Sequence, residues 1–316
     1  MNPALERCLA ADVRVAPAVV ADVAHWLPRW RATAAEYPAP MARAIAGGHD
    51  ADRVGWAFAA DYQTALRALV PELPDDRIAT LCVTEDAGNR PRDIATTITT
   101  LPDGGLSISG TKRWATLGPD SATLLVVGRL AEATGELPSL RVARIASTTP
   151  GLTLTAIPAT PFAPEVPHAV VSLDDVRLAP EELLPGDGYS RYVRPFRTIE
   201  DVHVTAAVLA YLLRAARARS WPAAIAERIA ATLVALASIA AGKTGAAETH
   251  VALEGALQWA HALYAEATTL WAAADDEAAA RWQRDTALFD VAGKARAARV
   301  RRAWERLASV EGDDDA

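Results

Sequence analysis

Apolar and polar positions divide the chain into three zones with different periods. Residues 1–75 form the first zone, where short helical stretches are broken at prolines and glycines such as Pro28, Pro71 and Gly47. Over 56–70 the apolar side chains recur at the i, i+3/i+4 spacing of one helical face. They are Trp56, Phe58, Ala59, Tyr62, Leu66 and Val70. The zone therefore predicts an N-terminal helical segment.

Residues 76–185 have a strand-like pattern instead. Here β-branched residues gather in short runs separated by turn signals, and a Pro-Asp-Gly-Gly turn at 102–105 between two such runs predicts a hairpin. The expected strands are 94–100, 106–109, 122–127, 139–145 and 170–173. Prolines spaced between 158 and 167 would interrupt regular pairing. The zone predicts a small antiparallel β-domain or barrel.

From Thr198 onward the chain is rich in alanine and has the helical period. Four helices are expected, at 199–219, 222–241, 246–274 and 277–309, with Asp275 and Asp276 as cap residues of the last. An acidic tail follows, ending at residue 316. The chain is thus expected to be α+β: short N-terminal helices, a central antiparallel β-domain, and a C-terminal four-helix bundle over 186–316.

Charge and cysteine content narrow the classes of function. The 316 residues carry 32 basic and 39 acidic side chains, a net charge of −7, which disfavours a nucleic-acid partner. Cys8 and Cys82 lie far apart without metal-ligand spacing, so no metal site or disulfide scaffold is expected. The apolar run 233–241 is too short to span a membrane. We therefore expect a cytoplasmic protein with no membrane partner.

Four short motifs follow one another through the β-domain and into the bundle. They are LCVTED at 81–86, GTKRWAT at 110–116, LDDVRLAP at 173–180 and LPGDG at 184–188. In this order and spacing they resemble the flavin-contacting region of the acyl-CoA dehydrogenase family, over roughly residues 79–215. The chain looks like a short, divergent member of that family, whose activity is α,β-dehydrogenation of acyl thioesters with FAD.

The resemblance implies specific roles for four residues. Val83 and Thr84 would face the isoalloxazine ring, with the Thr84 hydroxyl bonding its pyrimidine edge. Trp114 would pack against the ring system, and Thr116 would donate a hydrogen bond near the flavin N5 atom. Fixed donors of this kind stabilise the negative charge that builds up on a reduced flavin. A homo-oligomer is also expected by resemblance.

Departures from the family pattern concern the substrate and the catalytic base. Arg90 stands where the family has a serine that touches the acyl-CoA, so it could meet an anionic group or fill the thioester channel. Gly293 occupies the position where the family usually has the glutamate that acts as catalytic base. Some relatives draw the base from the first bundle helix, and alignment there places either Glu200 or Asp201 at its position. Asp201 otherwise replaces an arginine that helps to hold substrate. Acidic residues at a helix N-terminus also have a purely structural explanation.

The segments that anchor the adenosine half of FAD lack counterparts. Gln258 is followed by Trp-Ala-His-Ala in place of the family's glycines, so close backbone approach to a pyrophosphate is lost. FMN as the cofactor, or the absence of any flavin, is therefore an alternative to FAD. The expected activity is that of an oxidoreductase acting on CH–CH groups of an acyl thioester or another small molecule. A flavin-dependent monooxygenase and a non-catalytic binding or assembly protein that has lost the cofactor are the alternatives.

Overall fold

The computed structural model describes residues 2–132, 139–274, 276–291 and 293–311, and the chain divides into two compact units. A helical unit comprises residues 1–65, 160–164 and 198–316, and a sheet unit comprises residues 66–159 and 165–197. The helical unit therefore draws on both ends of the sequence. The α+β class expected from the sequence is confirmed, and the acidic tail from residue 312 lies outside the described residues.

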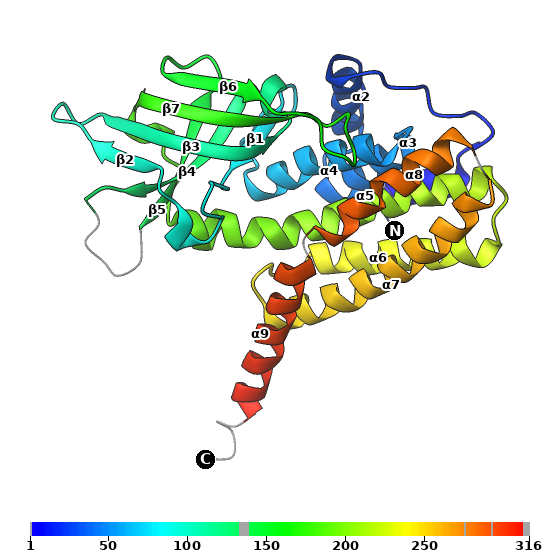
Figure 1. The fold of residues 1–316 in the computed structure, drawn as a ribbon. Coiled ribbons are helices and arrows are strands. Elements are labelled where there is room, and N and C mark those ends of the chain that lie inside the picture. The colour runs from blue at the N-terminus through cyan, green and yellow to red at the C-terminus, as the bar shows by residue number, and fades with distance from the viewer. Residues whose placement is uncertain (1, 133–138, 275, 292, 312–316) are drawn as a thin grey trace. The chain divides into compact units, whose positions relative to one another are not determined.

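Helices dominate the two ends of the sequence (Figure 1). They are α1 (Pro3–Ala10), α2 (Val23–Glu36), α3 (Pro40–Asp50), α4 (Val54–Leu69), α5 (Arg194–Ala218), α6 (Ala223–Ala240), α7 (Ala247–Ala272), α8 (Glu277–Asp285) and α9 (Gly293–Glu311). The α5 helix ends where Ser220 takes a left-handed conformation (φ 51°) just before Pro222, which starts the approach to α6.

Strands of the sheet unit form one sheet in the order β1-β4-β2-β3-β7-β6, with β5 paired to the other edge of β4 (Figure 1). They are β1 (Ala79–Cys82), β2 (Thr97–Thr100), β3 (Leu106–Thr116), β4 (Thr123–Leu130), β5 (Leu140–Ala146), β6 (Leu152–Ala156) and β7 (His168–Leu178). One face of the sheet buries an aliphatic core that includes Ile98, Ile108, Leu124, Val126 and Val171.

The sheet is mixed, whereas the sequence predicted an antiparallel one. The expected hairpin is present as β2 and β3, with Ile98 opposite Ile108, but β1 and β2 both pair with β4 in parallel. Parallel partners are joined by long connections, and here residues 83–122 join β1 to β4 while residues 101–122, which include β3, join β2 to β4. Hydrophobic alternation does not distinguish the two pairings, because both orientations bury alternate residues.

Strand lengths also differ from expectation. The β3 and β7 strands each have 11 residues, longer than the predicted runs, because their exposed polar positions continue the alternation beyond the apolar core. The β6 strand was not predicted. It is a short edge strand with exposed threonines and little buried surface, so its apolar signal is weak.

The α4 and α5 helices have no solvent face over much of their length. From Val54 to Arg67 every residue of α4 except Phe58 is buried, and so is every α5 residue from Thr205 to Leu213. Helices of this kind normally carry only apolar side chains. Close approach contributes to the burial, since a Cβ atom on Gly48 of α3 would lie 2.1 Å from the Ala207 carbonyl oxygen of α5. Polar side chains on these two helices therefore need an explanation.

The fourth bundle helix is divided into α8 and α9, where the sequence predicted one helix over 277–309. A 3₁₀ turn at Thr286–Asp290 follows α8 and brings Phe289 to 4.4 Å from Tyr264 and 5.4 Å from Trp282, measured between ring centroids. Burial of this aromatic cluster offsets the interruption of the helix. Asp276 is the N-cap of α8, accepting a hydrogen bond from the Ala279 N–H, while Asp275 lies outside the described residues.

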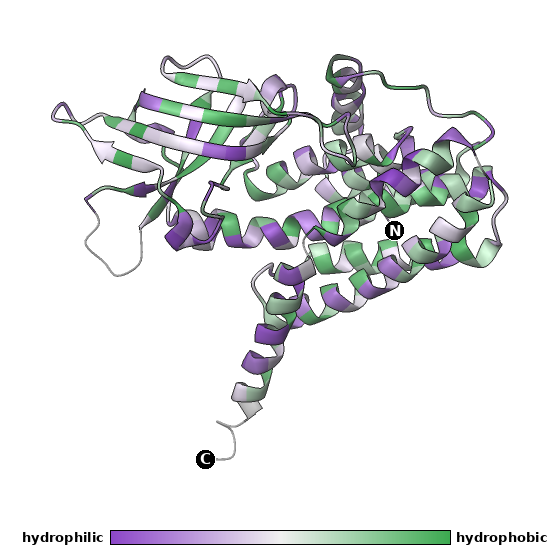
Figure 2. Ribbon diagram, in the orientation of Figure 1, coloured by the Kyte–Doolittle hydropathy of each residue, from purple (hydrophilic) through white to green (hydrophobic). Residues whose placement is uncertain are grey.

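By length and composition, α6 is apolar enough to cross a membrane, and Figure 2 shows it mostly in the hydrophobic colour. A single helix of this kind is weak evidence for a membrane span, and 28% of this one is buried inside the structure. Charged residues interrupt its outer face, where Arg228 forms an ion pair with Glu266 of α7. Helix α9 is far more polar in the same view.

Candidate functional site

A buried ion pair fixes the segment that follows β1. Lys112 of β3 is 0% exposed, and its Nζ atom lies 2.6 Å from Glu85 Oε1. The same carboxylate accepts hydrogen bonds from the Ala95 and Thr96 N–H groups and from the Thr96 hydroxyl. Burial tends to raise the pKa of Glu85, but the hydrogen bonds from Lys112, Thr96 and Ala95 outweigh it and lower that pKa. This network holds residues 83–86 against β3.

Backbone pairing then places Thr84 beside Trp114. The Arg113 N–H donates to the Thr84 carbonyl oxygen at 2.7 Å, and the Arg113 side chain pairs with Asp86. Val83 and Thr84 are half-buried, and the Val83 carbonyl accepts a long hydrogen bond from Lys112. Of the four residues expected at the flavin ring, Val83, Thr84 and Trp114 are therefore adjacent in space.

Trp114 sits on a bulge in β3. Between the pairs Lys112–Val171 and Ala115–Ala169 the register shifts, so that β3 has one residue more than β7. Trp114 takes a left-handed backbone conformation (φ 60°), and its side chain is 55% exposed. A bulky residue in this region of φ is strained, and such strain gathers at functional sites. The bulge turns the indole out of the sheet and presents it to solvent.

His168 completes this site and was missed by the sequence reasoning. It is the β7 partner of Thr116, and its ring lies edge-on to the Trp114 ring, 6.1 Å between centroids at 75°. Burial lowers the pKa of His168, opposed by a hydrogen bond with the backbone of Val166, and so favours the neutral imidazole. No local sequence signal marks His168, because only the β3–β7 register brings it to Trp114.

These residues fit the ring of a flavin. Within the described chain, no hydrogen-bond partner is found for the hydroxyls of Thr84 and Thr116 or for the Trp114 indole N–H. An exposed flat aromatic side chain flanked by unused donors matches the isoalloxazine, which combines an aromatic surface with a polar edge. Fewer contacts are available for the adenosine half of FAD, because Gln258 is followed on α7 by an exposed Trp259 rather than by glycine.

Arg90 lies in the same unit, on the connection after β1. Its N–H donates to the carboxylate of Asp93, the last residue of the 3₁₀ turn Pro91–Asp93, and its side chain is exposed. The neighbouring Asn89 accepts a hydrogen bond from Arg197 at 3.1 Å. In the described chain neither Arg90 nor Arg197 has a carboxylate partner. The Arg197 guanidinium thus contacts Asn89, and Arg90 is the next residue in the sequence.

The two candidate bases on α5 have different surroundings. Asp201 is 6% exposed, and its two oxygens accept hydrogen bonds from Arg296 (2.9 Å) and Arg299 (2.6 Å) of α9. Both oxygens are therefore occupied in joining α5 to α9, which favours a structural role for Asp201. Glu200 is half-buried and is not part of that ion pair.

Asp61 of α4 is a buried acid that the sequence reasoning passed over. It is 0% exposed, and neither carboxyl oxygen has a hydrogen-bond partner. Burial raises the pKa of Asp61 well above its usual range, and the negative charge of Glu200 raises it further. A carboxyl group among the buried positions 54–67 was the available signal, since acids are rarely fully buried.

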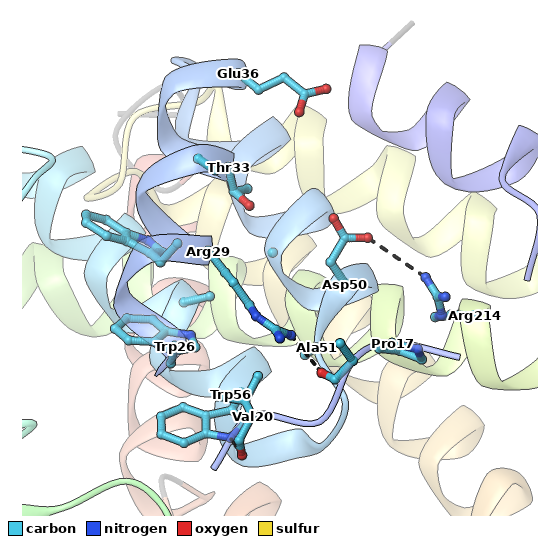
Figure 3. Close-up of a pocket in the computed structure, with 15 residues that line it drawn as sticks. Pro17, Val20, Trp26, Arg29, Thr33, Glu36, Asp50, Ala51, Trp56 and Arg214 are labelled. Atoms are coloured by element: carbon cyan, nitrogen blue, oxygen red, sulfur yellow. Dashed lines mark hydrogen bonds and ion pairs between the residues drawn. The ribbon is translucent and has the colours of Figure 1, made fainter. Parts of the chain in front are cut away.

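A pocket in the helical unit contains none of the predicted site residues. It is a cavity of about 380 Å³ between α2, α3, α4 and the segment before α2, with Asp50, Arg29 and Arg214 at its rim (Figure 3). Trp26, Trp30 and Trp56 line it but are each under 5% exposed and stack on one another. Its aromatic floor is core rather than a binding surface.

The remaining candidates form no further site. Gly293 begins α9 and has open space where a side chain would project. Part of the basic run of α9 is used by Asp201, and Arg301 pairs with Glu305. Among the described residues, no group of three or more His, Cys, Asp or Glu side chains could hold a metal ion.

Comparison with solved structures identifies the fold. The butyryl-CoA dehydrogenase of Megasphaera elsdenii matches with a TM-score of 0.72 at 14% identity, covering 96% of this chain and 98% of that one. A putative acyl-CoA dehydrogenase of Mycobacterium smegmatis matches with a TM-score of 0.68 at 16% identity, covering 93% and 96%. The FAD complex of PigA matches with a TM-score of 0.68 at 14% identity, covering 96% and 92%.

No protein-family model matches the sequence, and neither does any curated protein. The chain therefore has an acyl-CoA dehydrogenase-like fold, as its motifs predicted.

Proposed function

We propose that this chain is a flavin-dependent oxidoreductase that carries out α,β-dehydrogenation of an acyl thioester. The observation that carries the proposal is the Trp114 bulge, where a strained backbone presents an exposed indole beside unused hydrogen-bond donors. The fold agrees with this proposal, since structures with the same fold include a butyryl-CoA dehydrogenase and an FAD complex.

The cofactor would be held in the sheet unit by Val83, Thr84, Trp114 and Thr116, with His168 supporting the Trp114 ring. A bound flavin supplies the acceptor for the two electrons that leave the β-carbon as hydride. The two threonine hydroxyls have no other hydrogen-bond partner in the described chain, so they would be available to donate where negative charge develops on the ring. We propose FAD as the cofactor.

Glu200 is the proposed base. It would take the α-proton of the thioester onto a carboxylate oxygen as the double bond between the α- and β-carbons forms. Asp201 is the poorer candidate because two arginines occupy its oxygens, and any contribution to substrate binding would be indirect, through the position of α5.

Arg90 is the proposed contact to the substrate. With Arg197 it supplies two positive charges without a carboxylate partner in the described chain. A thioester with an anionic group, either on the acyl part or on its carrier, would be attracted there. We further propose a cytoplasmic homo-oligomer, by analogy with the family.

The first test is spectroscopic. The purified protein should show flavin absorbance, and an acyl-CoA such as butyryl-CoA should bleach it without oxygen. Glu200→Gln should keep the absorbance and slow bleaching by at least about 100-fold, the range for loss of a general base. Glu248→Gln, an exposed change on α7, is the matched control and should behave as wild type. Unchanged bleaching in Glu200→Gln would refute the assignment of the base.

The open position at Gly293 also favours a second function, a flavin-dependent monooxygenase, which needs no glutamate there. Its signature would be a yellow protein that acyl-CoAs do not bleach but that inserts oxygen when a reductase is supplied. A colourless protein that takes up no added flavin would contradict both activities and indicate a binding or assembly role.

A further inference from the structure

The loop that joins β6 to β7 leaves the sheet and returns to it at His168. Its two ends are close together, since the Ile157 N–H donates to the His168 carbonyl oxygen at 3.0 Å. Residues 160–164 at its tip belong to the helical unit, whereas the residues on either side of the tip belong to the sheet unit. Prolines at 158, 161, 164 and 167 have no N–H to donate, so the loop has few hydrogen bonds of its own.

One side chain from a helix holds the tip of this loop. Asp285, the last residue of α8, accepts a hydrogen bond of 2.7 Å from the Ala163 N–H. Among the described residues, this is the only hydrogen bond between residues 158–164 and the rest of the protein. Ala163 is 4% exposed and has a left-handed backbone (φ 45°), which is uncommon for alanine. The buried, strained tip therefore depends on a single hydrogen bond from outside the loop.

The surroundings of Asp285 make this hydrogen bond a strong one. Asp285 is 0% exposed, and its two oxygens also accept from Nε and Nη2 of Arg284, at 2.7 and 2.9 Å. The acceptor is thus an ion-paired carboxylate, and hydrogen bonds to charged groups are roughly twice as strong as those between neutral groups. Because the carboxylate and Ala163 are both buried, loss of the Asp285 side chain would leave the Ala163 N–H without a partner.

The returning arm of the loop leads to the candidate flavin site. Only residues 164–167 separate Ala163 from His168. The His168 ring lies against Trp114, and its hydrogen bond with the Val166 backbone is made to this arm. Prolines occupy the first and last positions of the arm, and their fixed φ angles make it stiff. A displacement of the tip should therefore displace His168 as well.

We propose that Asp285 is a latch for the loop 157–168 and, through that loop, a positioning residue for His168 and Trp114. With the latch formed, the arm holds the His168 ring edge-on to the indole. With the latch broken, the tip is free and His168 is less buried. This role rests on the proposed function only in so far as Trp114 binds the flavin ring.

NMR of the full-length apoprotein tests the latch without flavin or catalysis. In the wild type the Ala163 amide should exchange with solvent at least about 100-fold more slowly than the Thr160 and Phe162 amides, because only Ala163 donates to a buried partner. This measurement requires no variant. Equal exchange rates at the three positions would overturn the proposal.

Two substitutions separate a positioning role from a contribution to stability. Asp285→Ala removes the acceptor, so His168 should become more exposed and its pKa should rise toward the ordinary value of about 6.5, because burial is what lowers it. Asp285→Asn keeps an oxygen that can accept from the Ala163 N–H, and should preserve the wild-type titration of His168. Asp290→Ala, at an exposed aspartate in the turn after α8, is the control. An unchanged His168 titration in folded Asp285→Ala would contradict the latch.

Flavin titration distinguishes a failed latch from a failed cofactor site. Asp285→Ala should raise the Kd for flavin by up to about 10-fold, the range for loss of the ring contact at Trp114, and Asp285→Asn should not. If His168 responds to Asp285→Ala but the wild type binds no flavin, the proposed function fails and the latch remains. If the Kd rises while the His168 titration is unchanged, the latch is refuted although a flavin site is present.

Discussion

At the scale of single residues, Trp114 combines two unfavourable features, a left-handed backbone and an exposed indole. The backbone alone costs an ordinary residue about 1–2 kcal/mol. Such a cost is reasonable where binding uses the side chain, and asparagine is among the side chains that tolerate this conformation best.

Trp114→Asn should therefore leave the free energy of unfolding unchanged or higher while it weakens flavin binding. Loss of the ring contact is expected to cost about 0.5–1.5 kcal/mol, roughly a 2- to 10-fold rise in Kd. Flavin fluorescence titration and urea unfolding measure the two effects. Trp304→Asn, at a similarly exposed tryptophan on α9, is the control and should not change flavin affinity.

Asp61 makes stability depend on pH in a direction opposite to that of most acids. Its pKa is raised in the folded protein, so its favourable contribution is complete below the unfolded pKa of about 4 and is lost as the pH rises toward the folded value. Asp61→Asn does not titrate. Its stability relative to wild type should therefore rise with pH, by up to about 1.4 kcal/mol per pH unit.

Urea unfolding between pH 4 and pH 8 measures this difference. The exposed Asp76→Asn change serves as the control and should show no comparable trend. A constant difference between wild type and Asp61→Asn across the range would mean that Asp61 is ionised in the folded state.

At the scale of elements, Asp201 decides how α5 and α9 are joined. Asp201→Ala would leave Arg296 and Arg299 largely buried without their partner, which should destabilise the protein by about 3 kcal/mol. The same change at the exposed Asp86–Arg113 pair should cost less than about 1 kcal/mol. Chemical unfolding compares the two variants. If Asp201→Asn instead raised the KM for substrate and left stability unchanged, a substrate role would be favoured.

The sequence predicted elements whose signal is local and missed those set by partners distant in the chain. The N-terminal helical segment, the β2–β3 hairpin and the helices α5 to α7 have a regular period and were recognised. The parallel pairing of β4 and the exposed edge strand β6 were not, because register and edge position do not alter the local pattern. The break between α8 and α9 depends on the packing of Phe289 against Tyr264.

The candidate site shows the same division. Val83, Thr84, Trp114 and Thr116 could be named from motifs that are continuous in the sequence. His168 could not be named, since it becomes important only beside Trp114 of another strand, whereas Asp61 had an available signal as a carboxyl group among the apolar positions of α4.

At the scale of the whole molecule, the two halves of an FAD site are unequally represented. The sheet unit supplies the ring-contacting residues, while the glycines that would approach a pyrophosphate are missing at 259–262. The apoprotein should therefore bind FMN within about 10-fold of its affinity for FAD, since the adenosine part would add less than about 1.4 kcal/mol. Titration calorimetry with both flavins measures the ratio. A preference for FAD above 100-fold would reveal adenosine contacts outside the family motifs.

Of the 32 basic residues, only three are lysines, namely Lys112, Lys243 and Lys294. Lys243 and Lys294 are exposed, whereas Lys112 is fully buried and forms an ion pair with Glu85. An amine-acylating reagent should modify the exposed pair within minutes and reach Lys112 only when the 83–86 segment detaches from β3. The rate of Lys112 modification therefore measures local opening of the site. Bound flavin should lower that rate.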